Sequence, residues 1–322
     1  MRITKLSNNF TPLHNGIFFG INTESDTPTD ISVEVVNSLT DEAVATLVLR
    51  GVTSTTVNIA PYIERIDNYT PKSLSQTTLI DAPTAIYKIR CCEIESEEVI
   101  ISVNRNKVTG LSSIITALPS SRRITYGEND EVLIISKPHE NITVEIVTDT
   151  DESLRLAQTT LTGAITFVLS LEDFERDIRS LDILIYDESE ELAHLHYTVA
   201  PRRKMAVRLA WLSDGGSIEH YTFPVSHREF RKVEKQHILQ AKELQTTLCK
   251  VKQFITVCSR YEPHATIAAL AQIASAPKVW LCEEDGALQS VAVTTQRIEY
   301  NLLGTPDAAV FELCLWQEEV AL

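Results

Sequence analysis

Two distant segments of this chain carry almost the same alternating pattern. Residues 30–36 read DISVEVV and residues 141–147 read NITVEIV, with an apolar residue at every second position. This period is typical of a strand that buries one face. Three further pairs of segments match in the same order along the chain: 18–21 with 132–135, 57–59 with 167–169, and 86–89 with 183–186. Four matches in one order indicate an internal duplication, so we expect two copies of one folding unit.

Each copy contains many short apolar stretches, separated by segments rich in Asp, Asn, Ser, Thr and Pro. Short strands with such spacing predict an antiparallel, immunoglobulin-like β-sandwich. We place the first sandwich at residues 1–118 and the second at residues 119–204. Residues 72–84 are expected to form a polar loop, and residues 171–178 a helical turn on a sandwich edge. The core-facing triplets are expected on equivalent strands: Ile31, Val33 and Val35 in the first sandwich, and Ile142, Val144 and Ile146 in the second.

A different pattern begins at residue 205. Residues 205–224 read MAVRLAWLSDGGSIEHYTFP, in which a strand alternates up to Trp211, the Asp-Gly-Gly segment reverses the chain and a second strand returns. Residues 248–258 predict another strand, and Pro263 opens a short helix that ends before Pro277. The charged segment 226–245 fits either a helix or a pair of long polar strands. The sequence therefore predicts a mainly β protein, with a β-rich module carrying one short helix at residues 205–322.

Length and charge narrow the class of protein. The chain has 322 residues, which suits two or three domains, and its net charge of −15 disfavours a nucleic-acid partner. The basic run at residues 202–204 is interpreted as a solvated turn. The N-terminus lacks the apolar core of a signal peptide, and no segment reaches the ~18 apolar residues of a membrane span. We therefore expect synthesis in the cytosol, with no membrane and no nucleic-acid partner.

The chain contains no recognisable catalytic or cofactor motif. His194 and His196 lie two residues apart on an expected strand, where both imidazoles share a face, but no third metal ligand is identifiable nearby in sequence. The segment from Asp149 lacks the Gly and Glu of a calcium loop. The six cysteines form no C-x-x-C pair, so we interpret them as reduced strand residues, with Cys91 and Cys92 pointing to opposite faces. We expect no enzyme, no metal and no cofactor.

Two segments of the last third resemble a known family. Residues 207–224, VRLAWLSDGGSIEHYTFP, resemble the strand, aromatic, turn and Tyr-x-Phe-Pro hairpin of virion structural proteins of tailed phages, particularly those of gut Bacteroidetes-type hosts. Residues 251–281, ending ASAPKVWL, resemble the strand, short helix and Ser-Pro-x-Val module of these proteins, except that Ala276 separates Ser275 from Pro277. The resemblance covers only the last third of the chain. It implies a tail, collar or baseplate component without catalytic residues, which reaches the virion after synthesis.

Our leading hypothesis is therefore a non-enzymatic phage or prophage virion protein that binds other virion proteins, copies of itself, or both. An adhesin-like or carbohydrate-binding sandwich protein is the alternative, and an enzyme comes third. We expect association through the C-terminal third. Its helix is rich in alanine, whereas the strands around it carry Trp280, Phe311, Leu315 and Trp316, which a thin core leaves partly uncovered. Position in the particle, symmetry and copy number are left open.

Overall fold

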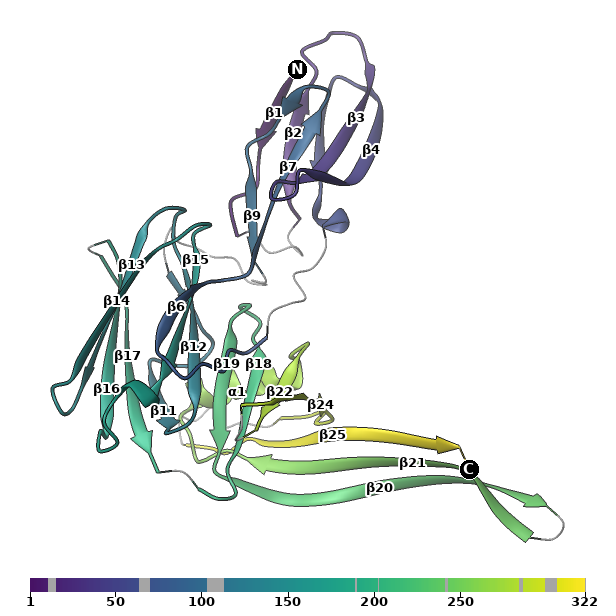
Figure 1. The fold of residues 1–322 in the computed structure, drawn as a ribbon. Coiled ribbons are helices and arrows are strands. Elements are labelled where there is room, and N and C mark those ends of the chain that lie inside the picture. Colours follow the sequence, from purple (N-terminus) through teal and green to yellow (C-terminus); the bar gives the residue numbers. More distant parts are fainter. Residues whose placement is uncertain are drawn as a thin grey trace.

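The structure is a computed structural model that describes residues 1–10, 16–63, 70–102, 113–188, 190–201, 203–240, 243–283, 286–298 and 306–321. Three β-rich modules follow one another along the chain, and a long arm leaves the third module (Figure 1). The expected mainly β fold with one short α-helix is confirmed. Within the described parts of the chain, no helix is long and apolar enough to cross a membrane.

The first module is a sandwich of two antiparallel sheets. One sheet has the order β1 (Arg2–Lys5), β2 (Phe18–Asn22), β5 (Ser54–Asn58). The other has the order β4 (Glu42–Val52), β3 (Thr29–Asn37), β7 (Thr84–Cys91), β8 (Ile94–Glu95), with β9 (Val99–Ser102) also beside β7. The short 3-10 helix η2 (Ala60–Tyr62) follows β5. Alternating residues of both sheets, among them Phe19, Val33, Val35 and Ile89, form the core.

The second module is also a sandwich of two sheets. It departs from the expected antiparallel pattern in one pair, because residues 121–125 and 196–200 pair in parallel. One sheet has the order β10 (Ser113–Ile115), β12 (Asn129–Ile135), β15 (Ala164–Ser170), β6 (Thr78–Asp81). The other has the order β11 (Ser121–Thr125), β17 (Glu190–Ala200), β16 (Ser180–Asp187), β13 (Asn141–Thr148), β14 (Ser153–Thr159). The 3-10 helix η3 (Leu171–Asp173) follows β15, within the segment expected to form a helical turn.

The two sandwiches repeat one topology. The sheet order β1, β2, β5 corresponds to β10, β12, β15, and the order β4, β3, β7, β9 corresponds to β14, β13, β16, β17. The four matched sequence pairs fall on β2 with β12, β3 with β13, β5 with β15, and β7 with β16. Val33 and Val35 are fully buried on β3, as are Ile142, Val144 and Ile146 on β13, while Ile31 is only partly buried. The repeated pattern therefore marks strands with equivalent places in their sheets.

The expected polar loop at residues 72–84 is present at residues 72–77 but is interrupted by a strand. Residues 78–81 form β6, which pairs with β15 and so lies at the edge of the second sandwich. Leu79, on β6, is buried in the core of that sandwich. Strands β6 and β10 both precede residue 119, so sheet pairing crosses the boundary that the sequence suggested. The sequence pattern does not show this pairing, because the partner of a short strand can lie far away in sequence.

The third module joins two further sheets around a helix. One sheet has the order β19 (Ile218–Phe223), β18 (Val207–Leu212), β22 (Val279–Cys282), β23 (Leu288–Ser290). The other has the order β20 (Val225–Gln240), β21 (Glu243–Cys258), β25 (Val310–Ala321), β24 (Ala292–Val293). Helix α1 (His264–Ala271) continues as the 3-10 helix η4 (Gln272–Ala274), and Pro263 is its N-cap rather than its first residue.

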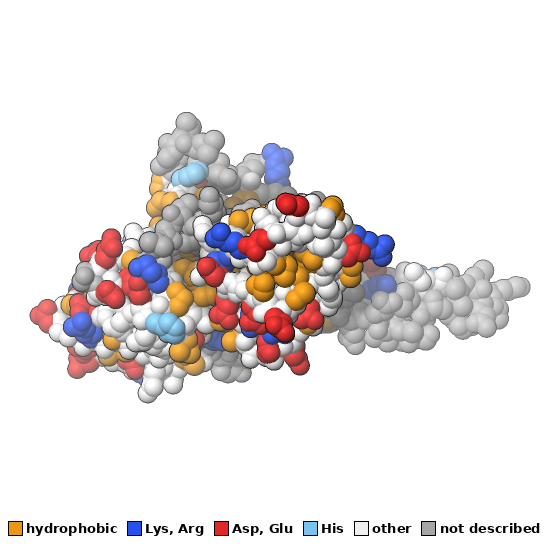
Figure 2. Space-filling model, turned by 90° about the horizontal axis from the view of Figure 1, so that it is seen from above, with side chains coloured by type: hydrophobic (Ala, Val, Ile, Leu, Met, Phe, Trp, Pro, Cys, Tyr) orange, Lys and Arg blue, Asp and Glu red, His pale blue; other side chains and the backbone are white. Residues whose placement is uncertain are grey.

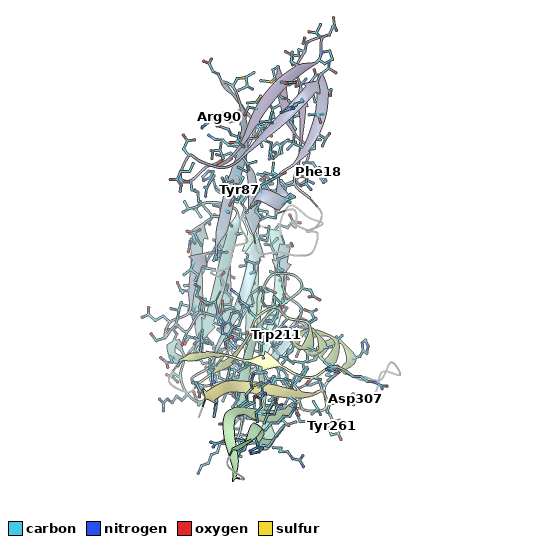
Figure 3. The ribbon with its side chains drawn as sticks, turned by 90° about the vertical axis from the view of Figure 1, so that its right-hand side faces the viewer. Phe18, Tyr87, Arg90, Trp211, Tyr261 and Asp307 are labelled. Carbon is cyan, nitrogen blue, oxygen red and sulfur yellow. The ribbon has the colours of Figure 1, made fainter. Side chains whose placement is uncertain are left out.

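The core of this module surrounds Trp211. Trp211 is fully buried and packs in one cluster with Ile267 and Leu270 of α1, whereas Tyr261 at the edge of the module is 79% exposed (Figure 3). The predicted reversal at Asp-Gly-Gly is confirmed. Gly216 has a φ of +88°, and its N–H donates to the carbonyl of Ser213 at 3.0 Å. Of the four large side chains expected to be partly uncovered, Trp280 and Phe311 are buried, whereas Leu315 and Trp316 are only partly buried.

Candidate functional site: the arm and the polar interface at its base

Two long strands form an arm that projects from the third module. The hairpin strands β20 and β21 have 16 residues each, so the arm extends about 50 Å at roughly 3.3 Å per residue (Figure 1). Strand β25 joins the inner part of the arm, where Cys258 to Leu248 pair with Val310 to Ala321. The strand alternative for residues 226–245 is therefore the one that the structure adopts.

Aromatic contacts hold the arm together near the module. The rings of Phe230 and Phe254 stack with their centroids 5.0 Å apart, and the guanidinium of Arg231 lies 5.9 Å from the centroid of the Trp316 ring. The indole N–H of Trp316 donates to Gln253 Oε1 at 2.8 Å. Farther out, every β20 side chain from Arg231 to His237 is exposed. In this described stretch the arm has no second layer to bury a face, and such ribbons are marginally stable alone.

The arm differs from the rest of the chain in charge. Residues 225–258 contain seven Lys and Arg residues and three Glu residues, a net charge of +4. Because the whole chain carries −15, the remainder carries −19. Acidic side chains are accordingly spread over the face of the molecule seen from above (Figure 2). A basic arm on an acidic body favours contacts with an acidic partner surface.

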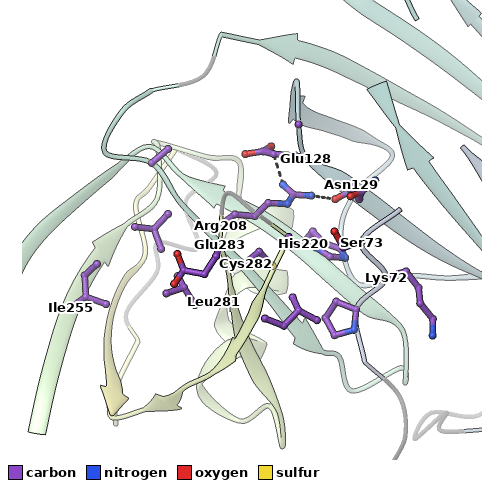
Figure 4. A pocket seen from close by; sticks show the side chains of 16 residues that line it. Lys72, Ser73, Glu128, Asn129, Arg208, His220, Ile255, Leu281, Cys282 and Glu283 are labelled. Carbon is purple, nitrogen blue, oxygen red and sulfur yellow. Dashed lines mark hydrogen bonds and ion pairs between the residues drawn. The ribbon is translucent and has the colours of Figure 1, made fainter. Parts of the chain in front are cut away.

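The base of the arm rests on a polar interface between the second sandwich and the third module. Arg208 of β18 donates from Nη1 to Glu128 Oε2 at 3.1 Å, and the Thr222 hydroxyl donates to Glu128 Oε1 at 2.8 Å. A second bond from Arg208 reaches the carbonyl of Asn129 (Figure 4). The side chains of Arg208 and Glu128 are only 9% and 10% exposed, so this pair ties the two modules together in a site largely removed from water.

His220 of β19 makes the next contact across this interface. Its Nε2 lies 3.1 Å from Glu131 Oε1, and both side chains are only 3% exposed. Burial alone lowers the pKa of His220, but the Cys282 thiol and the Glu131 carboxylate outweigh it and raise the pKa to about 9. Among the described residues, His220 Nδ1 has no hydrogen-bond partner. The raised pKa favours the protonated imidazole, which the Glu131 carboxylate attracts across the interface.

Glu219, the neighbour of His220, anchors the chain that enters the second sandwich. Its carboxylate accepts hydrogen bonds from the Thr116 hydroxyl at 2.9 Å, the Ala117 N–H at 2.7 Å and the Ser217 hydroxyl at 2.6 Å. Burial raises the pKa of Glu219, although Arg122 and these hydrogen bonds oppose the shift. The interface thus fixes the third module against β10 and the segment after it.

Two hollows flank this interface. One, with a volume of about 350 Å³, is lined by Arg208, His220, Cys282 and the Lys72–Ser73 segment (Figure 4). The other, of about 300 Å³, is lined by Arg122, Tyr221, Arg260 and Glu262. Several of their polar groups are already engaged with one another: Arg208 pairs with Glu128 in the first hollow, and in the second the Tyr221 hydroxyl donates to Glu262 Oε1 at 2.9 Å. The hollows are therefore interpreted as gaps between packed modules.

The sequence did not reveal these interface residues. Arg208 lies between the apolar positions of the first hairpin strand and His220 lies on the returning strand, and both are buried against the second sandwich. Alternation shows that a strand has two different faces, but it does not distinguish solvent from a neighbouring module. The only signal was the run of small and apolar residues around Arg208, in which Ala206 and Ala210 leave room for close packing.

The structure brings the two histidines singled out by sequence to one carboxylate. His194 Nε2 and His196 Nδ1 lie 2.9 Å and 3.0 Å from Asp182 Oδ1, and these histidines lower the pKa of Asp182. The His side chains are 53% and 45% exposed, so the group lies at the surface. In the part of the chain that the structure describes, no cluster of three or more His, Cys, Asp or Glu side chains is arranged to hold a metal ion.

The other residues singled out by sequence contribute to packing or turns, or lie exposed at the surface. Cys91 is buried at the end of β7, whereas Cys92 is exposed in the turn that follows, with a φ of +55°, so the two do not occupy opposite faces of one strand. Asp149 accepts hydrogen bonds from the N–H groups of Arg179 and Ser180, which lower its pKa, so it stabilises a turn. Of the basic run 202–204, Arg202 lies outside the described residues, whereas Arg203 and Lys204 are exposed in a turn.

Comparisons with known proteins leave the family open. No protein-family model matches the chain, and no curated protein matches it. A solved structure described as a biofilm-associated protein BSP domain is 12% identical, with a TM-score of 0.20, covering 62% of this chain. This chain spans only 30% of that protein. A multidomain protein including DUF1735 from Bacteroides ovatus is 10% identical, with a TM-score of 0.18, covering 65% of this chain and 94% of the other.

Proposed function

We propose that this chain is a non-enzymatic structural component of a protein assembly and that its arm makes the assembly contact. The observation that carries the proposal is the arm formed by β20 and β21, in which every β20 side chain from Arg231 to His237 is exposed. A long ribbon without a packing layer gains stability when a partner covers it. The buried pairs Arg208–Glu128 and His220–Glu131 hold the module at the base of the arm against the second sandwich, so the arm projects from a rigid support.

The specific assembly that we propose is the virion of a tailed phage, in which this chain is a tail, collar or baseplate component. The support comes from the hairpin and helix motifs at residues 207–224 and 251–281, which resemble those of such virion proteins. In this proposal, the two tandem sandwiches act as a spacer between the arm and the contacts that the N-terminal part of the chain makes in the particle. Its partners are then other virion proteins, copies of the chain, or both.

A shortened arm tests this function. In the variant, an Asn-Gly turn replaces residues 234–250, so that Val233 and Val251, which are paired in β20 and β21, flank a two-residue loop. Full-length and shortened chains are each purified alone and together with the products of the genes that flank their own. We expect only the full-length chain to form a stable complex, as measured by mass photometry. If the full-length chain stays monomeric in every mixture, or if the shortened chain associates equally well, the proposal is wrong.

A further inference from the structure

The arm has two open edges where three strands lie side by side. Strand β20 is the edge strand on one side. On the other side, β24 pairs with β25 only at Leu313 and Cys314, and the Leu315 carbonyl accepts a hydrogen bond from the Gln289 side chain at 2.9 Å. Beyond Trp316, no described strand pairs with the outer edge of β25. Open edges present backbone N–H and C=O groups that pair readily with another strand.

The directions of the strands allow the two edges to meet between copies. Strands β20 and β25 both run antiparallel to β21, so they are parallel to each other. When β20 of one copy is placed beside β25 of another in parallel, the two arms point the same way. The first copy then keeps its β25 edge free and the second copy keeps its β20 edge free, so the same contact can repeat with further copies.

The two edge strands also carry opposite charges at the same distance along the arm. The register through β21 places β20 residues 231–236 level with β25 residues 316–321, because Val233 pairs with Val251 and Val251 pairs with Glu318. The β20 segment contains Arg231, Lys232 and Lys235 and one Glu, whereas the β25 segment contains two Glu and no Lys or Arg. Opposite charges on adjacent strands stabilise the pairing, and like charges oppose it.

We propose that β20 of one copy pairs in parallel with β25 of a second copy, and that repetition of this contact joins copies of the chain into a ring. This inference rests on the proposed function and names the partner of the arm. A pairing of two β20 strands places basic residues against basic residues, and a pairing of two β25 strands places acidic residues together. Only the mixed pairing joins complementary charges, and such head-to-tail contacts close into rings when the rotation allows.

Charge reversal on each edge tests the pairing. One variant carries Lys232→Glu and Lys235→Glu on β20, and a second carries Glu318→Lys and Glu319→Lys on β25. A control carries Lys250→Glu and Lys252→Glu on the central strand β21, which reverses the same number of charges away from the edges. Circular dichroism and tryptophan fluorescence first establish that each full-length variant is folded. Sedimentation velocity then measures self-association over a range of concentrations.

We expect each edge variant to need at least about tenfold more protein for half-association, and the control to change by less than about threefold. An equimolar mixture of the two edge variants should associate again, because each then meets an edge of opposite charge. If the wild-type chain is monomeric, if the control is as impaired as the edge variants, or if the mixture fails to associate, the inference is wrong. A monomeric chain whose arm still binds a flanking-gene product overturns the ring but leaves the proposed function standing.

Discussion

Replacement of Arg122 by methionine should strongly destabilise the second sandwich. Arg122 lies on β11, and its Nη1 lies 3.3 Å from both Asp130 Oδ2 and the Tyr197 hydroxyl. The side chains of Arg122 and Asp130 are only 3% and 4% exposed. Burial by itself raises the pKa of Asp130, but the positive charges of Arg122, His220 and Arg208 outweigh it and lower the pKa below its ordinary value. Asp130 is therefore ionised, and its main counter-charge is Arg122.

The expected loss of unfolding free energy comes from the Asp130 carboxylate, which the substitution leaves buried without its main partner. In Arg122→Met, the Asp130 carboxylate stays buried with its strongest counter-charge removed, and breaking one side of a buried pair costs about 3–5 kcal/mol. The neighbouring Arg123 is exposed, so Arg123→Met is a matched control that should change stability by less than about 0.5 kcal/mol. The double variant Arg122→Met, Asp130→Asn removes the uncompensated charge and should recover part of the loss.

Two optical probes separate the modules in this assay. All three tryptophans of the chain, Trp211, Trp280 and Trp316, lie in the third module, so their fluorescence reports its unfolding, whereas circular dichroism reports all three modules. A chain of several modules need not unfold in one step, so both signals are followed in urea. We expect Arg122→Met to lower the midpoint of the second sandwich by about 2 M urea. The reasoning is refuted if the free energies of unfolding of Arg122→Met and Arg123→Met differ by less than about 1 kcal/mol. It is also refuted if the double variant is as unstable as Arg122→Met, because the buried Asp130 charge would then not be the cause of the loss.

Three further predictions concern other parts of the chain. The raised pKa of His220, about 9 against an ordinary 6.5, stabilises the fold by about 3 kcal/mol below pH 6, and this contribution is lost as the pH rises through 9. The fluorescence-detected midpoint should therefore fall between pH 7 and pH 10 in the wild type, more steeply than in His220→Gln. Phe254→Ala removes a buried ring of the aromatic stack and should cost about 3 kcal/mol in the same assay, whereas a cost below about 1 kcal/mol contradicts the packing at the arm base. Gly163→Ala should destabilise the second sandwich more than Gly51→Ala destabilises the first, as compared by thermal melts. Both glycines have a positive φ, but only at Gly163 does a Cβ come within 2.5 Å of a backbone carbonyl oxygen, that of Ser136.

Much of the fold could be predicted from the sequence because the signal is local. The alternation in residues 30–36 and 141–147 specifies strands with one buried face, and the structure places these segments at equivalent positions in two sandwiches. The Asp-Gly-Gly turn and the proline before α1 act through backbone geometry that depends only on neighbouring residues. Such features need no knowledge of what lies across the fold.

The remaining features depend on which segments meet. Residues 78–81 form a strand because β15 offers an open edge, and the segment itself is too short and polar to indicate this. The hairpin pattern does not show what Arg208 and His220 contact; they are buried beside Glu128 and Glu131, which approach from another module.

The arm shows most clearly how local sequence preference and strand pairing contribute differently to the fold. Residues 226–245 carry charges at spacings that fit a helix as well as a strand, so local preference leaves both states close in free energy. Pairing along β21 and β25 then decides between them, because backbone hydrogen bonds to strands that are already ordered outweigh a small difference in propensity. The sequence by itself determined where strands and turns form; the tertiary structure decided which edges pair, which charges are buried and that the third module projects an arm.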